Sequence, residues 1–180
     1  AFAISNVLNN PDNVDQVLED GGVYKNFVDL ALLNVEEQGD ENTKKLLADE
    51  KVQEIIRSSV KPGDIQDSSK SIISGVYAWL DGKTAQPEFE IDLVKPADTV
   101  VTKLSAYAEE RANGLPACTV QQLQTVDFQS DVLSIPCLPP GVTGSQVGQQ
   151  FSAQAKDQVA FLKDPVIPSS EVLKEVDTTS

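Results

Sequence analysis

The chain has 180 residues, of which 28 are acidic and 14 are basic, so its formal net charge is −14 at pH 7. This length suits one compact domain with a buried core. The acidity excludes a phosphate-binding surface for nucleic acid and disfavours electrostatic docking on an anionic membrane. Histidine is absent, which excludes imidazole general bases and, with only two cysteines, leaves too few ligands for zinc. We therefore expect a non-enzymatic protein with no catalytic residues and no cofactor.

The first residues of the chain are apolar. Residues 1–4 form a short apolar run that turns polar at Ser5. Two interpretations stay open for residues 1–9: they are the end of a membrane-spanning helix, or the end of a helix that packs on the core. The chain contains no methionine, so we expect a processed product or a piece of a longer protein. No apolar run reaches the roughly 18 residues that a membrane-spanning helix needs.

Helical patterns fill the first half of the chain. Asn10 and Pro11 are typical of a helix start, and a pair of glycines ends this first helix. A second helix is expected over residues 23–38. Its apolar residues recur at helical spacing, at Val23, Phe27, Leu30 and Leu33. An interrupted helix over residues 46–56 follows, and then a long amphipathic helix over residues 64–82.

Residues 88–93 alternate strictly between acidic and apolar side chains. This pattern predicts a strand that is buried on one face only. Its apolar face consists of Phe89, Ile91 and Leu93, and its acidic face of Glu88, Glu90 and Asp92. A partner strand is expected at Val132, Leu133 and Ile135.

The second half combines two helices with a long loop. One helix is expected to begin at Asp98, after Pro96, and to end at Asn113. Residues 118–140 have the composition of a loop, with one helical turn around residues 121–126. A last long helix is expected over residues 144–162.

The predicted fold is a mainly α, single-domain helical bundle with a minor β element of one or two short strands. The helical domain is expected to cover residues 10–164. Residues 165–180 follow the last expected helix and are expected to form a short, flexible, acidic C-terminal tail.

Cys118 and Cys137 are the only cysteines. In a reducing cytosol such a pair is usually two buried thiols, whereas outside the cytoplasm it is usually a disulfide. The two residues form no Cys-x-x-Cys motif, so redox catalysis is not expected. We predict a structural disulfide, which would stabilise the fold by roughly 3 kcal/mol through loop closure.

The acidic strand face is a candidate ligand site. Successive carboxylates of Glu88, Glu90 and Asp92 would lie about 6.6–7 Å apart on a strand. Ca²⁺ prefers oxygen ligands, and inverting glycosidases hold two carboxylates at a similar separation. We favour a simpler interpretation, a solvent-facing surface whose like charges discourage pairing between strand edges. Ca²⁺ binding and a carboxylate-only glycan hydrolase remain the alternatives.

Residues 58–61 match the Ser-x-x-Lys pattern of penicillin-binding proteins, with Ser58 and Lys61 at its ends. In that pattern the lysine amine activates the serine hydroxyl one helical turn away. Pro62 follows directly and disfavours helical geometry at Lys61. We therefore interpret the match as a coincidence.

The single tryptophan, Trp79, is a candidate contact for a partner. On a helix it points away from the face that holds Tyr77 and Leu80, so one interpretation is an exposed anchor for a glycan or a protein. Tryptophan is more often largely buried, with its N–H hydrogen-bonded. On that ground we favour a position in the core.

Several short segments together resemble a family of uncharacterised bacterial membrane-anchored proteins. They are Gly-Val-Tyr at 22–24, Val-Tyr-Ala-Trp-Leu-Asp-Gly-Lys-Thr at 76–84, Phe-Glu-Ile-Asp-Leu at 89–93, and Cys-Leu-Pro-Pro at 137–140 after Cys118. In this family an extracytoplasmic helical domain lies between two transmembrane helices. The resemblance covers residues 10–140 and implies no active-site residues. It implies attachment to the bacterial cytoplasmic membrane through flanking helices, with both cysteines in an oxidising compartment.

The expected function is that of a non-enzymatic binding domain. The absence of histidine and of any ordered catalytic motif supports this expectation. The partner would be an unknown protein, a cell-envelope component or a small ligand. A purely structural spacer is the remaining alternative.

Overall fold

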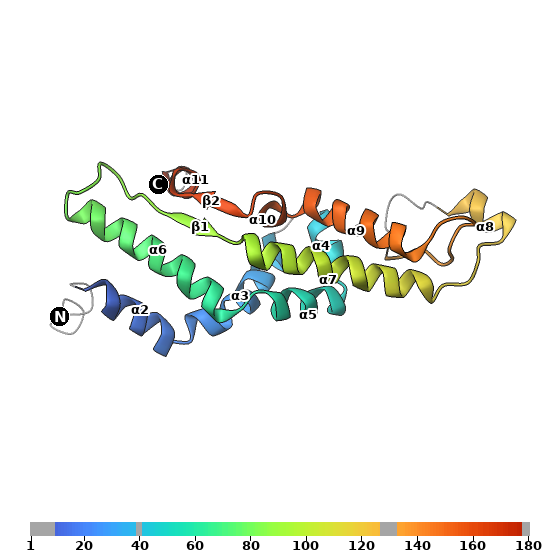
Figure 1. The fold of residues 1–180 in the computed structure, drawn as a ribbon, viewed down its shortest axis with the longest axis horizontal. Coiled ribbons are helices and arrows are strands. Elements are labelled where there is room, and N and C mark those ends of the chain that lie inside the picture. The colour runs from blue at the N-terminus through green and yellow to red at the C-terminus, as the bar shows by residue number, and fades with distance from the viewer. Residues whose placement is uncertain (1–9, 39–40, 127–132, 178–180) are drawn as a thin grey trace. The chain divides into compact units, whose positions relative to one another are not determined.

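A computed structural model describes residues 10–38, 41–126 and 133–177 of the chain. These residues are mainly helical and include one small two-stranded antiparallel sheet (Figure 1). The prediction of a mainly α fold with a minor β element is therefore confirmed. Within the described ranges, no helix is long and apolar enough to cross a membrane.

Contacts divide the chain into two compact units. Unit 1 consists of Ala1–Ala97 together with Asp164–Ser180, and unit 2 consists of Asp98–Lys163. The last residues of the chain thus belong with its first half.

The described part of unit 1 opens with five helices, whose starts and ends follow local sequence signals. They are α2 (Pro11–Asp20), α3 (Val23–Gln38), α4 (Glu41–Leu47), α5 (Glu50–Ser59) and α6 (Pro62–Leu80). The side chain of Asn10 caps α2 by accepting a hydrogen bond from the backbone N–H of Asp12, at 3.0 Å. Between α2 and α3, Gly22 adopts a positive φ of 71°, which permits the sharp turn.

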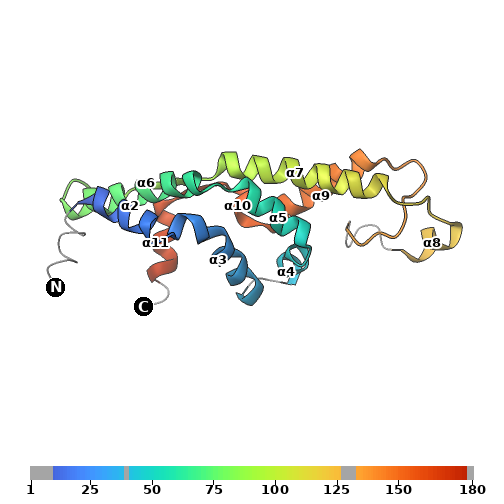
Figure 2. The same ribbon diagram turned by 90° about the horizontal axis from the view of Figure 1, so that it is seen from below.

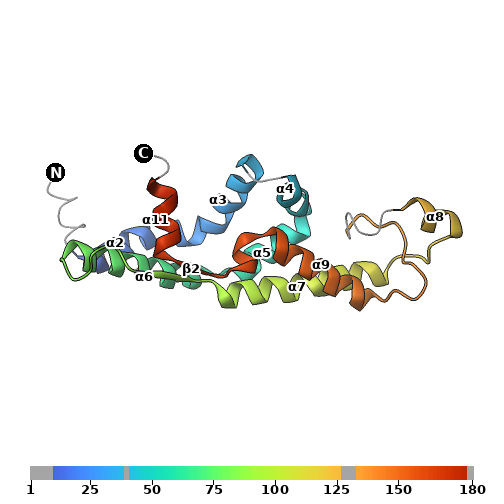
Figure 3. The ribbon, with the colours of Figure 1, turned by 90° about the horizontal axis from the view of Figure 1, so that it is seen from above.

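The helices of unit 1 pack around a modest apolar core. Its buried apolar side chains include Tyr24, Leu32, Leu47, Val52, Ile55 and Ile65. α2 runs beside α6 (Figure 1), and α3 contacts α2, α4, α5 and α6. Figures 2 and 3 show that α3 diverges from α6 toward the C-terminal end of α3.

The sheet of unit 1 joins residues far apart in the sequence. β1 (Glu90–Asp92) pairs antiparallel with β2 (Val166–Pro168), and Ile91 lies opposite Ile167. The predicted strand is thus correctly located but shorter than 88–93. Its alternation is confirmed, because Phe89, Ile91 and Leu93 are half-buried and the acidic residues between them are exposed.

Two predictions about this sheet are corrected. Leu133 and Ile135 are buried in irregular structure and do not pair with β1, and Val132 lies outside the described residues. Residues 166–177, which fall within the expected flexible tail, instead form β2 and α11 (Ser169–Asp177). Backbone pairing explains the order there: the N–H of Ser169 donates to the carbonyl of Phe89, at 2.9 Å.

The described residues of unit 2 form most of a long helix and three shorter helices. α7 (Val94–Asn113) enters the unit at Asp98 and is followed by α8 (Val120–Thr125), α9 (Gly144–Gln158) and α10 (Ala160–Lys163). α7 begins four residues earlier than predicted because the Asp92 carboxylate accepts from the N–H of Val94, at 2.9 Å. Pro96 is tolerated because it falls in the first helical turn. The last predicted helix is split, since Val159 has extended backbone angles.

The core of unit 2 is formed by α7, α9 and the chain around the second cysteine. Its buried side chains include Val100, Leu104, Ala108, Ala112, Leu133, Ile135, Cys137, Val147, Phe151, Ala155 and Leu162. α9 approaches α7 closely at Gly148, where a methyl group would overlap the carbonyl oxygen of Ser105.

Candidate functional site

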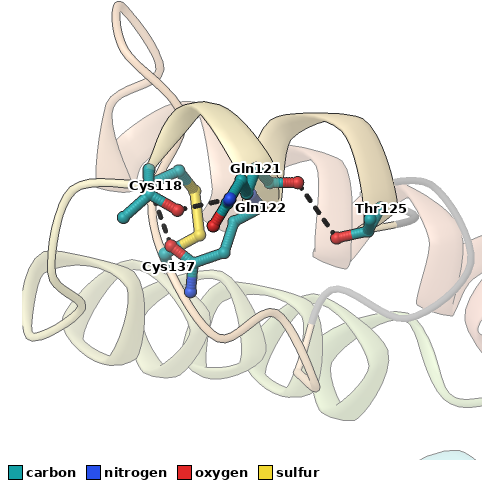
Figure 4. The surroundings of a disulfide bond; sticks show 6 residues. Cys118, Gln121, Gln122, Thr125 and Cys137 are labelled. Carbon is teal, nitrogen blue, oxygen red and sulfur yellow. Dashed lines mark hydrogen bonds between the residues drawn. A yellow bond between two sulfur atoms is a disulfide. The ribbon is translucent and has the colours of Figure 1, made fainter.

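Cys118 and Cys137 form a disulfide, as predicted (Figure 4). Cys137 is completely buried, whereas Cys118 is half-buried. Backbone hydrogen bonds hold the two segments together on both sides of the bridge. The N–H of Cys118 donates to the carbonyl of Leu138 at 3.0 Å, and the N–H of Leu138 donates to the carbonyl of Pro116 at 2.8 Å. The bridge is therefore a structural link between two adjacent segments.

α8 begins directly after the disulfide and has a reciprocal cap. The N–H of Gln122 donates to Thr119 Oγ1 at 3.3 Å, and the N–H of Thr119 donates to Gln122 Oε1 at 2.9 Å. At the other end of the helix, the Thr125 hydroxyl donates to the carbonyl of Gln121 at 3.1 Å (Figure 4). Two apolar side chains of this helix, Val120 and Leu123, are exposed.

The acidic strand face does not assemble a ligand cage. Glu88, Glu90 and Asp92 are all exposed, and Asp92 already accepts a hydrogen bond at the start of α7. In the part of the chain that the structure describes, no three metal-ligating side chains gather into a group that could hold an ion. A glycan hydrolase needs one carboxyl buried enough to stay protonated, and none of these three is buried.

Trp79 lies at the surface, with 43% of its area exposed, so the favoured core position is wrong. Its neighbour Leu80 is 65% exposed and is the last residue of α6. Gly82 follows with a positive φ of 71° and turns the chain out of the helix. Lys83 forms an ion pair with Asp81, at 2.9 Å. The end of α6 therefore presents two adjacent large apolar side chains beside a neutralised charge pair.

The residues of the Ser-x-x-Lys match make hydrogen bonds at the end of α5 and the start of α6. The hydroxyls of Ser58 and Ser59 both donate to the carbonyl of Ile55, at 3.1 and 2.6 Å. Lys61 lies outside α5 and caps the start of α6 with its backbone N–H, which donates to the Asp64 carboxylate at 3.0 Å. This backbone role agrees with the interpretation of the match as coincidental.

Sequence patterns did not reveal a polar cluster that links α2, α3 and α6. The buried hydroxyl of Tyr24 donates to Asp15 Oδ1 at 2.8 Å and lies 3.2 Å from Ser69 Oγ. The second oxygen of Asp15 accepts from Gln66 at 3.2 Å and forms an ion pair with Lys70 at 3.6 Å. Burial raises the pKa of Tyr24, and the neighbouring Asp15 adds to this rise. Only the fold brings these residues together, so no local signal announces the cluster.

The apolar stripe that predicted α3 is itself exposed. Val23, Phe27, Leu30 and Leu33 keep between 40% and 60% of their area in contact with solvent. Among the α3 side chains that the structure describes, Tyr24 and Leu32 are buried, and they lie on its other side. The apolar periodicity that predicts this helix therefore identifies an exposed face of α3, and the buried face is a different one.

No protein-family model, curated protein or solved structure matches this chain. Its function therefore has to follow from its own residues.

Proposed function

We propose that this chain is the extracytoplasmic, non-enzymatic domain of a membrane-anchored bacterial protein, and that it binds a partner protein or a cell-envelope component. The observation that carries the binding function is the exposed pair Trp79 and Leu80 at the end of α6. Tryptophan is enriched among the residues that dominate the binding energy of interfaces, because it buries a large rigid surface.

The disulfide supports the extracytoplasmic location. Disulfides persist in oxidising compartments and are rare in the cytosol, where thiols are kept reduced. A bridge between a completely buried Cys137 and a half-buried Cys118 forms part of the unit 2 core. It suits a chain that folds outside the cytoplasm.

Photo-crosslinking in cells tests the binding function. A photoreactive phenylalanine analogue at position 79 should give a discrete crosslinked product in cells that express the anchored protein. The matched control places the analogue at Val120, which is 74% exposed on α8. Products that are identical at both positions, or absent at position 79, would contradict binding at the end of α6 and would favour a structural spacer.

Cysteine labelling tests the location separately. In the variant Cys137→Ser, Cys118 is left as the single thiol of the chain. A maleimide that cannot cross membranes should label this thiol once the outer layers of the cell are opened and the cytoplasmic membrane is left intact. Labelling only after lysis of that membrane would place the domain in the cytoplasm.

A further inference from the structure

One face of α3 is apolar and is left exposed by the residues of unit 1 that the structure describes. At 100° per residue, Val23, Phe27, Leu30 and Leu33 fall within roughly 120° of the helix circumference. Their exposed fractions are 40%, 44%, 60% and 56%. Single exposed apolar residues are normal on a protein surface, but a row of four on one helix face is typical of an interaction site. We call these four residues the α3 stripe.

The opposite face of α3 is already in use. Tyr24 and Leu32 are buried, and Asp29 forms an ion pair with Arg57 of α5 at 2.7 Å. The helix is therefore held in unit 1 by one side, and the stripe extends over about 15 Å of the other side, which is nearly three turns. A helix of similar length would match it.

Charge identifies the kind of helix that fits. The segments α2 and α3 carry a single basic residue, Lys25, against seven acids: Asp12, Asp15, Glu19, Asp20, Asp29, Glu36 and Glu37. Two of these acids already form ion pairs within the unit, Asp15 with Lys70 and Asp29 with Arg57, and the excess of negative charge remains. A partner with an apolar stripe and lysine or arginine at its margins gains both burial and electrostatic attraction.

Other occupants fit less well. A second copy of the chain carries the same net charge of −14, so electrostatic repulsion opposes its approach. Helices that lie in a lipid surface carry lysine and arginine on their polar face, and α3 has only Lys25.

We infer that the α3 stripe is a docking surface for a basic amphipathic helix of a partner protein. This inference goes beyond the function proposed above, because it names a second surface and the chemistry of its partner. It can fail while the crosslink at Trp79 succeeds, and the reverse also holds.

A pair of designed peptides tests the inference on the full chain. The first, of about 18 residues, places leucine on one helical face and lysine on the other; the second replaces every lysine by glutamate. Fluorescence anisotropy of the labelled peptides gives the dissociation constants. We expect the lysine peptide to bind, more weakly as salt is raised, and the glutamate peptide not to bind.

Variants locate the binding. The double substitution Leu30→Gln and Leu33→Gln should weaken binding of the lysine peptide about tenfold or more. The control Val120→Gln and Leu123→Gln removes two exposed apolar residues from α8 and should leave the dissociation constant unchanged. All four residues are exposed, so circular dichroism should show native melting for both variants.

Three results would overturn the inference. The first is equal affinity of the lysine peptide for wild type and for the α3 variant. The second is a dimer, seen by analytical ultracentrifugation, that the α3 variant loses, since the stripe would then bind a second copy. The third is co-sedimentation with vesicles of zwitterionic or anionic lipid that depends on Leu30 and Leu33.

Discussion

At the scale of single residues, Gly75 and Gly148 stand where two backbones approach too closely for a side chain. A methyl group at Gly148 would overlap the carbonyl oxygen of Ser105 on α7, and one at Gly75 would overlap the carbonyl of Glu88 just before β1. A backbone carbonyl cannot rotate away as the end of a flexible side chain can. Packing therefore requires glycine at these helical positions, although glycine lowers helix propensity.

The variant Gly148→Ala should lower the free energy of unfolding by about 1–3 kcal/mol, because α9 has to move away from α7. Gly63→Ala is the matched control, since nothing lies within 4 Å of the added methyl group. The control should be more stable than wild type by about 0.4–1 kcal/mol, through the reduced freedom of its unfolded chain. Urea unfolding measures both changes, and a Gly148→Ala protein as stable as wild type would contradict the close approach.

Tyr24 gives a pH-dependent prediction. Burial raises its pKa above the usual value of about 10. The hydrogen bond with Ser69 lowers this pKa, and the hydrogen bond and charge of Asp15 raise it, so that the net shift is upward. The unfolded chain therefore loses this proton at lower pH than the folded chain does. The stability that results is complete below about pH 10 and is lost as the pH rises through the folded pKa.

Tyr24→Phe removes both the hydroxyl and its titration. At pH 8 the variant should be about 1 kcal/mol less stable than wild type, because Asp15 and Ser69 lose a partner. As the pH rises above about 10, this difference should shrink, since only wild type loses stability by ionising Tyr24. A difference that stays constant, or that grows with pH in urea titrations, would contradict a raised pKa.

At the scale of elements, the disulfide holds the segment that carries α8. The two cysteines are 19 residues apart in the sequence, and closing a loop of this length stabilises a fold by about 3 kcal/mol. Cys118→Ser with Cys137→Ser should therefore lower the free energy of unfolding by about that amount, together with the loss of buried packing at Cys137. Adding reductant to wild type should reproduce most of this loss, whereas the double variant should not respond to reductant.

Most helices could be predicted because their signals are local. Asn10 with Pro11 fixes the start of α2, and Thr143, whose hydroxyl accepts from the N–H of Gln146 at 3.3 Å, caps α9. The partner of β1 could not be predicted in this way. Three-residue strands carry little periodicity, and the pairing of Ile91 with Ile167 joins residues far apart in the sequence.

The candidate sites also divide into those that the sequence predicts and those that depend on how the helices pack. The bridge between Cys118 and Cys137 was predictable because the chain has no other cysteine. The exposure of Trp79 was not, because helical spacing says which residues share a face but not which face meets solvent. The α3 stripe has the same origin: its periodicity is plain in the sequence, yet only the packing of Tyr24 and Leu32 shows that the stripe is the outer side.

At the scale of the whole molecule, charge is the dominant feature. The net charge is −14. The ion pairs Lys51–Glu54, Asp29–Arg57, Asp15–Lys70 and Asp81–Lys83 each have at least one exposed side chain. Exposed pairs contribute little stability, about 0–1 kcal/mol each. Repulsion among the remaining carboxylates therefore opposes compaction over the whole surface.

Salt should therefore stabilise this protein. Raising NaCl from about 20 mM to about 500 mM shortens the screening length from roughly 20 Å to roughly 4 Å, which weakens repulsion between surface charges. The melting temperature should rise accordingly.

The variant Asp20→Asn should have a higher melting temperature than wild type at low salt, because Asp20 is the last residue of α2, where a negative charge opposes the helix dipole. This variant should also gain less from added salt than wild type, since it has one repulsive charge fewer. A melting temperature that falls with salt would mean that attractive pairs such as Asp29 with Arg57 outweigh the repulsion, and would reverse the sign of the charge effect.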